Sequence, residues 1–173
     1  MIFVTVGTHE QPFNRLVGEI DKLAREGRLG EDAFIQRGLG AIIPEYCQSK
    51  EMLSFQELTQ KVSEARIVIT HGGPGSIMMP LMLGKPPIVV PRQRSFGEHV
   101  DNHQVDFTRR LEIGNKVIPI YDISLIADAI NEYDMLCSKL KLESKDEKTL
   151  KQLTSHLDEL TVSIARRNIP RSQ

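Results

Sequence analysis

The chain has 173 residues, of which 40% are hydrophobic and 26% charged, and this length and composition predict one folded domain rather than a disordered chain or a two-domain enzyme. Its 22 basic and 23 acidic residues leave a net charge of -1, which excludes a protein held on nucleic acid by its bulk charge. No apolar run reaches the ~20 residues of a membrane span, no signal peptide is recognisable, and Cys47 and Cys137 form no metal or disulfide pattern, so we expect a cytoplasmic protein.

Short apolar runs alternate with amphipathic segments in the first three quarters of the chain. Apolar residues recur with helical spacing from Phe13 onward, and Ser54 with Glu57 forms a capping box. We expect strands at 2–6, 33–36, 66–70, 87–91 and 116–120, helices at 13–23, 54–65, 77–83, 99–111 and 123–133, and irregular chain at 38–47. Strands alternating with helices predict an α/β fold, a single Rossmann-like domain whose parallel sheet binds ligands at the carboxyl ends of its strands.

The last part of the chain has a different composition. We assign 1–135 to the Rossmann-like domain and 136–173 to a charged linker and a C-terminal helix with a basic tail. Apolar residues step by three and four from Leu150 to Ile164, over fewer heptads than a coiled coil needs. Two interpretations remain open, a helix on its own domain and a helix that docks on a partner.

A glycine-rich loop follows the strand that ends at Thr70. Its sequence is His71-Gly72-Gly73-Pro74-Gly75-Ser76, and a helical segment comes directly after it. Glycines let the backbone approach a ligand, and the free N–H groups of a helix start attract phosphate. The alternative is a tight turn with Ser76 as the helix cap. A Walker A loop is excluded because Gly84-Lys85 is followed by Pro86.

A polar cluster, residues 98–104, follows the strand at 87–91. On a helix, His99 and His103 would share one face and could bind a metal, but Val100 replaces the Glu of HExxH and no third ligand is evident. We therefore expect no metal. Sugar hydroxyls need many hydrogen-bond donors and acceptors, which Asp101, Asn102 and Gln104 supply. A capped polar helix start on the surface is the alternative.

These motifs together resemble a known family. The carriers are Val-Thr-Val-Gly-Thr-His-Glu-Gln-Pro-Phe at the start, His-Gly-Gly-Pro-Gly-Ser, Gly-Lys-Pro-Pro-Ile-Val-Val-Pro-Arg-Gln and Phe-Gly-Glu-His-Val-Asp-Asn-His-Gln. Over roughly residues 1–133 the chain resembles the glycosyltransferase family 28 C-terminal domain. Within it, the chain is similar to small bacterial exopolysaccharide and capsule glycosyltransferase subunits and to the catalytic subunit of the eukaryotic two-chain N-acetylglucosaminyltransferase that extends dolichol-linked sugar.

The resemblance implies the donor-binding half of a GT-B fold, with a UDP-sugar as ligand. By position, Gly7 and Thr8 would face the cleft, and the diphosphate would meet His71, Gly72, Gly73, Gly75 and Ser76. The donor sugar would face Asp101, Asn102 and Gln104, with His99 in the same donor site. Met79 stands where the family has a Glu that binds the ribose. A thioether cannot accept two strong hydroxyl hydrogen bonds as a carboxylate can, so Met79 predicts weaker nucleotide binding.

The resemblance also implies a reaction and a partner. One Rossmann-like domain is half of a GT-B enzyme, so we expect the catalytic, donor-binding subunit of a two-chain inverting glycosyltransferase. It would move a sugar from a UDP-sugar to a polyprenyl-diphosphate-linked saccharide in exopolysaccharide or capsule synthesis. A membrane-anchored subunit would bind the lipid-linked acceptor and hold the chain at the inner face of the cell membrane.

The chemistry of the transfer is less defined by the sequence. His9 is the candidate general base, with no other catalytic residue assigned. No cofactor or metal is expected, because no acidic DxD pair is present. Two alternatives remain: a non-catalytic nucleotide-sugar-binding subunit that activates a separate transferase, and a nucleotide-sugar epimerase, which would need both domains in one chain.

Overall fold

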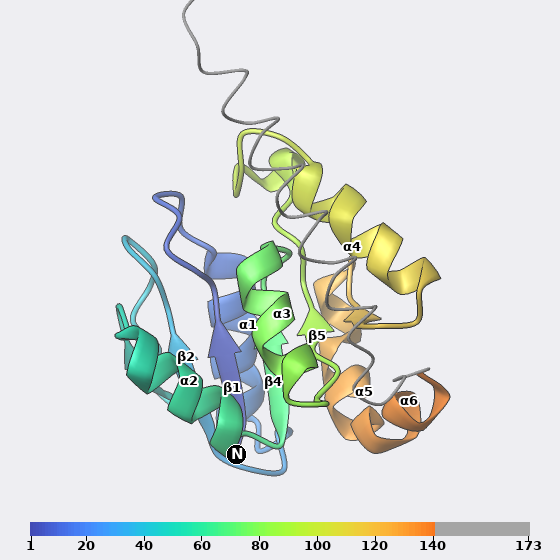
Figure 1. Ribbon diagram of the computed structural model, residues 1–173. Coiled ribbons are helices and arrows are strands. Elements are labelled where there is room, and N and C mark those ends of the chain that lie inside the picture. Colours follow the sequence, from blue (N-terminus) through green and yellow to red (C-terminus); the bar gives the residue numbers. More distant parts are fainter. Residues whose placement is uncertain (141–173) are drawn as a thin grey trace, which may run out of the picture. The chain divides into compact units, whose positions relative to one another are not determined.

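The structure of the protein, a computed structural model, describes residues 1–140. Six parallel strands form one sheet in the order β3-β2-β1-β4-β5-β6 (Figure 1). They are β1 (Ile2–Thr5), β2 (Ala33–Gln36), β3 (Gln48–Lys50), β4 (Ile67–Thr70), β5 (Ile88–Val89) and β6 (Ile118–Pro119). The strand order changes direction between β1 and β4, and in open α/β sheets ligands bind outside the carboxyl ends of the strands at such a point.

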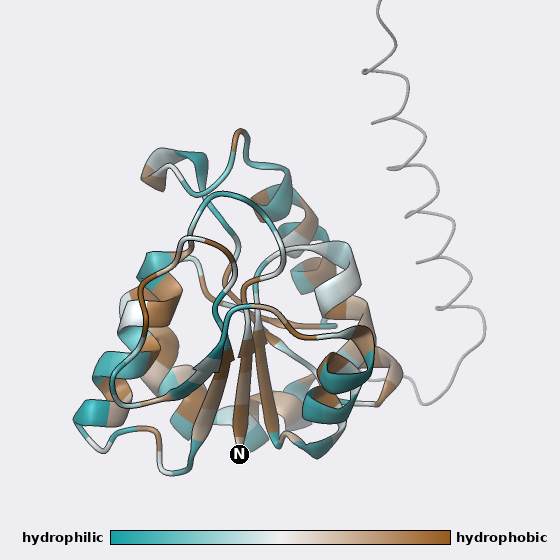
Figure 2. Cartoon of the chain, turned by 90° about the vertical axis from the view of Figure 1, so that its left-hand side faces the viewer, coloured by the Kyte–Doolittle hydropathy of each residue, from teal (hydrophilic) through white to brown (hydrophobic). Residues whose placement is uncertain are grey.

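Helices cover both faces of the sheet. They are α1 (Asn14–Arg25), α2 (Phe55–Glu64), α3 (Pro74–Met82), α4 (His103–Ile113), α5 (Ile126–Asn131) and α6 (Tyr133–Lys139), with single 3-10 turns η1 (Arg94–Phe96) and η2 (Ile123–Leu125). Residues of α1 and α5 join the larger apolar cluster, and residues of α2 and α3 pack in a second one. Figure 2 shows the apolar strands enclosed between helices with hydrophilic outer surfaces. The α/β prediction is therefore confirmed.

Two local signals explain how the first helices form. The buried side chains of α1 follow helical spacing, and Leu16, Ile20 and Leu23 have no exposed surface. Each such side chain contributes roughly 1.5–3 kcal/mol on burial. At the start of α2, the hydroxyl of Ser54 accepts from the N–H of Glu57, whose carboxylate accepts from the N–H of Ser54. The capping box predicted from the sequence is confirmed.

One strand was missed, and two helical segments were predicted with wrong bounds. Strand β3 was not predicted, because Gln48-Ser49-Lys50 lies at the sheet edge and carries no apolar side chain. Helix α4 begins at His103 and not at residue 99, because residues 98–102 form turns in which the carboxylate of Asp101 accepts from the N–H of His103. The helix expected at 123–133 begins as a 3-10 turn, and a new helix, α6, starts at Tyr133.

Part of the predicted C-terminal region lies outside the described residues. This applies to nearly all of the charged linker and to the apolar stripe from Leu150 to Ile164. Within residues 1–140, no helix has the length and apolar character that a membrane crossing requires.

Candidate functional site

The glycine-rich loop leads from β4 directly into α3. Gly73 is the N-cap residue, Pro74 occupies the first helical position, and no side chain caps the helix within the described part of the chain. The interpretation of Ser76 as the cap was therefore wrong, because Ser76 lies inside the first turn. The first backbone N–H groups of a helix lack partners within the helix, and the positive end of its dipole lies there. The start of α3 is thus suited to an anion.

A cavity of about 250 Å³ opens at the carboxyl ends of β1, β2 and β4. Its walls include six residues predicted for donor binding: Gly7, Thr8, His71, Gly73, Gly75 and Ser76. The remaining walls are Thr5, Gln36, Met52, Leu53, Leu58 and Pro74. Thr5 is in register with Gln36 on one side and with Thr70 on the other, so the three strands end level at the cavity. The structure therefore brings the β1 and β4 loops together at the strand-order switch.

The imidazole of His71 lies between two glycines. A Cβ added at Gly7 would lie 2.5 Å from Cε1 of His71, and a Cβ added at Gly73 would overlap Nε2 of the same ring. Gly7 also has a φ of +76°, which favours glycine. A Cβ at Gly75 would instead meet nothing within 4 Å. Gly7 and Gly73 are therefore required by the buried imidazole, whereas Gly75 leaves the backbone open to a ligand.

His71 is neutral in the folded protein. Its side chain is almost completely buried, and burial lowers the pKa of His71 to about 3, with a further contribution from the charge of Arg92. Gly72 lies on the other side of the loop, where an added Cβ would meet the backbone oxygen of Gln104 at 2.9 Å. Gly72 thus allows α4 to pack closely against the loop and does not line the cavity.

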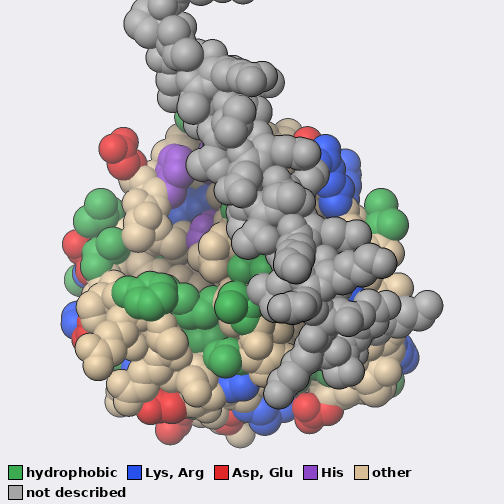
Figure 3. Space-filling view, in the orientation of Figure 1, with side chains coloured by type: hydrophobic (Ala, Val, Ile, Leu, Met, Phe, Trp, Pro, Cys, Tyr) green, Lys and Arg blue, Asp and Glu red, His purple; other side chains and the backbone are tan. Residues whose placement is uncertain are grey.

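A second group of predicted residues gathers at the β5–α4 loop. The ring centroids of His9 and His99 are 4.5 Å apart, and those of His99 and His103 are also 4.5 Å apart. Figure 3, in the orientation of Figure 1, shows histidine side chains at the surface in the upper part of the molecule. His99 precedes α4, so the expectation that His99 and His103 share a helix face was wrong, although their rings do meet. We name His9, His99 and His103 the histidine cluster.

The surroundings of His9 and His99 disfavour the charged form of both rings. Burial lowers the pKa of His9 and of His99, and the neighbouring cationic groups lower both further. The Nδ1 atom of His9 accepts from the N–H of Gln11 at 3.1 Å. In this arrangement the neutral ring carries its proton on Nε2, which is then a donor rather than a base.

Asn102 and Gln104 lie at different depths. The side-chain oxygen of exposed Asn102 accepts from the N–H of Arg94 at 3.0 Å. Gln104 is buried, and its Oε1 accepts from the N–H of Arg92 at 3.2 Å. Asn102 therefore stays at the surface of the loop, whereas Gln104 fixes the end of β5.

Arg92 links the two loops and was not predicted as a site residue. It is fully buried, and its guanidinium donates to the carbonyl oxygens of Val6 (2.9 Å), Gln11 (2.7 Å) and Glu98 (3.1 Å). Burial lowers the pKa of Arg92 to about 10, against the opposing effect of the Glu98 charge. The Glu98 carboxylate in turn accepts from Nε of Arg15 at 2.7 Å. An arginine directly after a buried strand was the sequence signal that could have identified it.

Met79 lies in an apolar environment. It packs at the edge of the cluster formed by Phe3, Val62, Ala65 and Val68, and it does not line the cavity at the carboxyl ends of the strands. Met79, at the position where the resemblance implies a ribose-binding Glu, is thus partly buried against hydrocarbon.

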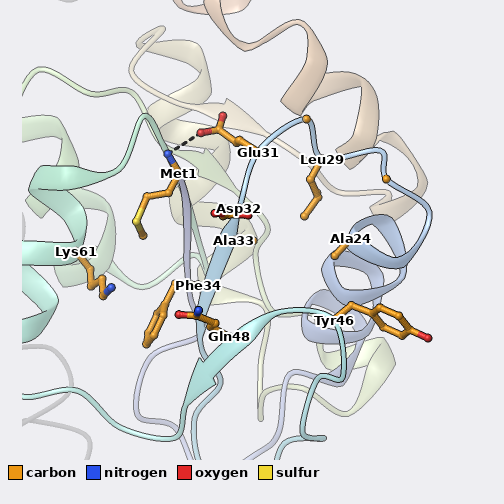
Figure 4. A pocket seen from close by; sticks show the side chains of 12 residues that line it. Met1, Ala24, Leu29, Glu31, Asp32, Ala33, Phe34, Tyr46, Gln48 and Lys61 are labelled. Atoms are coloured by element: carbon orange, nitrogen blue, oxygen red, sulfur yellow. Dashed lines mark ion pairs between the residues drawn. The ribbon is translucent and has the colours of Figure 1, made fainter.

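A larger cavity, of about 730 Å³, lies at the opposite end of the sheet (Figure 4). Met1, Glu31, Phe34 and Lys61 are among its walls, and none of the predicted site residues is. The Nζ atom of Lys61 lies 4.2 Å from the centroid of the Phe34 ring, a cation–π contact. Cavity size alone therefore does not mark the site.

Comparisons with known proteins agree with this geometry. The model of the family described as glycosyltransferase family 28 C-terminal domain matches residues 1–160. The UDP-N-acetylglucosamine transferase subunit ALG13 of Homo sapiens is 30% identical over 119 residues, which is 64% of this chain and 10% of the human protein. The chain therefore spans only about a tenth of that relative.

Two solved structures show the same fold. The glycotransferase of kitacinnamycin superimposes with a TM-score of 0.57 at 18% identity, covering 98% of this chain and 43% of that one. The calicheamicin glycosyltransferase CalG4 gives a TM-score of 0.56 at 14% identity, covering 97% of this chain and 44% of that one. Each superposition covers less than half of the solved glycosyltransferase, so this chain corresponds to one part of each of those proteins.

Proposed function

The chain belongs to the glycosyltransferase family 28 C-terminal domain family, and we propose that it is the catalytic, donor-binding subunit of a two-chain inverting glycosyltransferase. Its reaction moves a sugar from a UDP-sugar to a polyprenyl-diphosphate-linked saccharide during exopolysaccharide or capsule synthesis. The carrying observation is the uncapped start of α3 beside a cavity at the strand-order switch.

The diphosphate is the part of the donor that this geometry suits best. Backbone N–H groups at Gly75 and Ser76 lie in the first turn of α3, and the open space at Gly75 lets an anion reach them. The same dipole stabilises the leaving diphosphate without a metal or another cofactor. The apolar wall of the cavity, which includes Met52, Leu53 and Leu58, suits the nucleoside.

The donor sugar lies toward the β5–α4 loop in this proposal. Asp101 and Asn102 are exposed there and offer hydrogen-bonding groups. Gln104 is buried, and it fixes the end of β5 by accepting a hydrogen bond from the N–H of Arg92. His9 remains the candidate base, and it would have to give up the hydrogen bond from Gln11 and take the other tautomer before Nε2 could accept a proton.

The acceptor side belongs to a second chain in this proposal. The chain matches less than half of each solved glycosyltransferase, and the human relative is described as a transferase subunit. We propose a membrane-anchored partner that binds the lipid-linked acceptor and holds this chain at the inner face of the cell membrane. Correct positioning of donor and acceptor can supply about 7–11 kcal/mol of the barrier, so the purified chain alone should show little transfer.

The donor site is tested by titrating UDP into the wild type and two alanine variants in a calorimeter. Gly75→Ala adds a Cβ in the open space at the start of α3, and Gly18→Ala is the matched control in α1, where an added Cβ meets Ile42 at an ordinary 3.4 Å. We expect at least tenfold weaker UDP binding for Gly75→Ala and unchanged binding for Gly18→Ala. Equal affinity in all three folded proteins would remove the α3 start from the site.

The two-chain proposal is tested by measuring sugar transfer to a lipid-linked acceptor. The purified chain is assayed alone and with membranes that contain the co-expressed partner. Transfer should appear only with those membranes, and full activity of the chain alone would contradict the proposal.

One observation favours a second candidate, a non-catalytic subunit that activates a separate transferase. Met79 replaces the expected carboxylate and lies against hydrocarbon. In that case the reconstituted complex keeps its full transfer rate when the subunit carries His9→Gln. A fall in rate for this variant, with the complex still assembled and UDP binding unchanged, favours the catalytic proposal.

A further inference from the structure

The β5–α4 loop brings two imidazole nitrogens to one carboxylate oxygen. Nδ1 of His99 lies 3.3 Å from Oδ1 of Asp101, and Nδ1 of His103 contacts the same oxygen. One ligand atom from each of the three residues lies within 4.8 Å of the others. Three potential metal ligands thus converge although His99 lies outside α4, and Asp101 is the third ligand that the sequence did not reveal.

The spacing of these atoms suits a small metal ion. Zinc lies about 2.0–2.2 Å from nitrogen and oxygen ligands, and a tetrahedral arrangement at that radius separates the ligands by roughly 3.3–3.5 Å. The separation of 3.3 Å between His99 and Asp101 already meets this condition. The side chains of Asp101 and His103 are about half exposed (52% and 50%), so they have room to turn toward an ion.

The local backbone preforms the arrangement. The N–H of His103 donates to Oδ1 of Asp101, which ties the carboxylate to the first residue of α4. The buried side chain of His99 is fixed against the ring of His9. Nδ1 of His99 accepts a long hydrogen bond from the N–H of Asp101 at 3.4 Å, and an ion would take the place of that bond.

We propose that His99, Asp101 and His103 form a binding site for a divalent transition-metal ion such as Zn²⁺. Three protein ligands leave a fourth position open to water or to a ligand oxygen. The bound ion connects the β5–α4 loop to the first turn of α4 and so orders the loop. This site goes beyond the proposed transfer reaction and shares no residue with the α3 start, although Asp101 also lies on the proposed donor-sugar side.

The ligand set also predicts which ions bind. Imidazole nitrogen suits zinc, nickel and copper, whereas magnesium and calcium prefer sites built from oxygen atoms. Zn²⁺ should therefore bind and Mg²⁺ should not.

The test is calorimetric titration of the full chain with Zn²⁺, without nucleotide. His103→Gln and Asp101→Asn each remove one exposed ligand and leave the buried core untouched. Asp106→Asn, at an exposed carboxylate in the same turn of α4, and Asp128→Asn, at an exposed carboxylate of α5, are the matched controls. We expect at least tenfold weaker Zn²⁺ binding in the first two variants and unchanged binding in the controls.

Cobalt provides a second readout that reports coordination directly. Co²⁺ bound to the wild type should give visible absorption from a site with nitrogen ligands, and His103→Gln should lose that absorption. Equal Zn²⁺ affinity in the wild type, His103→Gln and Asp101→Asn would overturn the proposal, as would an equal loss in the two controls. Because no nucleotide is present, the result does not depend on UDP binding.

Discussion

The two ends of the parallel sheet differ in where their charged side chains lie. They are buried at the carboxyl end and lie near the surface at the amino end. At the carboxyl end, Arg92, His71 and Glu98 are buried, and His71 lines a cavity of about 250 Å³. At the amino end, Arg66 pairs with Glu31 at 2.6 Å and with Asp134 at 3.2 Å near the surface, and the cavity there is larger, about 730 Å³. The larger cavity thus lies at the amino end, whereas the buried charged side chains lie at the carboxyl end.

The difference teaches which end is built for a ligand. Burying a polar or charged group costs free energy unless it is hydrogen-bonded, so a domain selected for stability alone has no need of Arg92 in its interior. At the amino end, exposed ion pairs cost little and contribute little. We therefore locate function at the smaller cavity, and the following predictions test that contrast.

The largest expected effect comes from removing the buried cation. Arg92→Met leaves three carbonyl oxygens without their donor and separates the β1 loop from the β5–α4 loop. Breaking a buried charged network typically costs about 3–5 kcal/mol. Urea unfolding should show a loss of this size, and a loss below about 1 kcal/mol would contradict the linking role of Arg92.

The next effect is a dependence of stability on pH. His71 has a pKa of about 3 in the folded protein, far below its ordinary value of 6.5. The stability that it contributes is therefore fully present above pH 6.5 and is lost as the pH falls from about 6.5 toward 3. The slope reaches at most about 1.4 kcal/mol per pH unit for one proton.

The pH prediction is measured by urea unfolding at several pH values. The wild type and His71→Gln are compared between pH 7 and pH 4, so that groups common to both proteins cancel. The wild type should lose more stability with each unit of acidification. Parallel curves for the two proteins would mean that His71 is not neutralised by burial.

A third prediction compares two glycines of the same loop. Gly73→Ala forces a Cβ into the His71 ring, which should cost about 1–3 kcal/mol as an overpacked site does. Gly75→Ala lies in open space within a helix and should change stability by no more than about 1 kcal/mol, in the favourable direction. Thermal unfolding of both variants checks the order, and equal stabilities would refute the assignment of the ring contact to Gly73.

The sequence predicted the regular parts of the fold because they follow from local patterns. Apolar runs identified β1, β2, β4, β5 and β6, and the capping box identified the start of α2. β3 escaped because an edge strand with polar side chains has no hydrophobic signal. The start of α4 was misplaced because Asp101 favours a turn that helical spacing does not reveal.

The candidate site was predictable only where one segment supplies the residues. The glycine loop and the cluster at 98–104 could be read from the sequence, although their ligand-binding roles remain predictions. Two contacts depend on the strand order at the sheet's switch point. They are the ring contact between His9 and His99 and the hydrogen bond from Arg92 to the carbonyl oxygen of Val6. The same holds for the clash between Gly73 and His71, which spacing alone does not show.

The smallest expected effect is at the amino end of the sheet, and it is the counterpart of the Arg92 experiment. Arg66→Met removes a side chain that is 46% exposed and breaks its pairs with Glu31 and Asp134. Exposed pairs contribute about 0.2–1 kcal/mol, and 1 M salt reduces the screening length to about 3 Å. Urea unfolding should therefore show a loss of stability below about 1 kcal/mol in dilute buffer and a smaller loss in 1 M NaCl.

The loss of stability in Arg92→Met should instead change little with salt, since water and ions do not reach a buried guanidinium. If salt removed the two losses equally, both networks would be solvent-exposed in solution, and the contrast between the two ends of the sheet would fail.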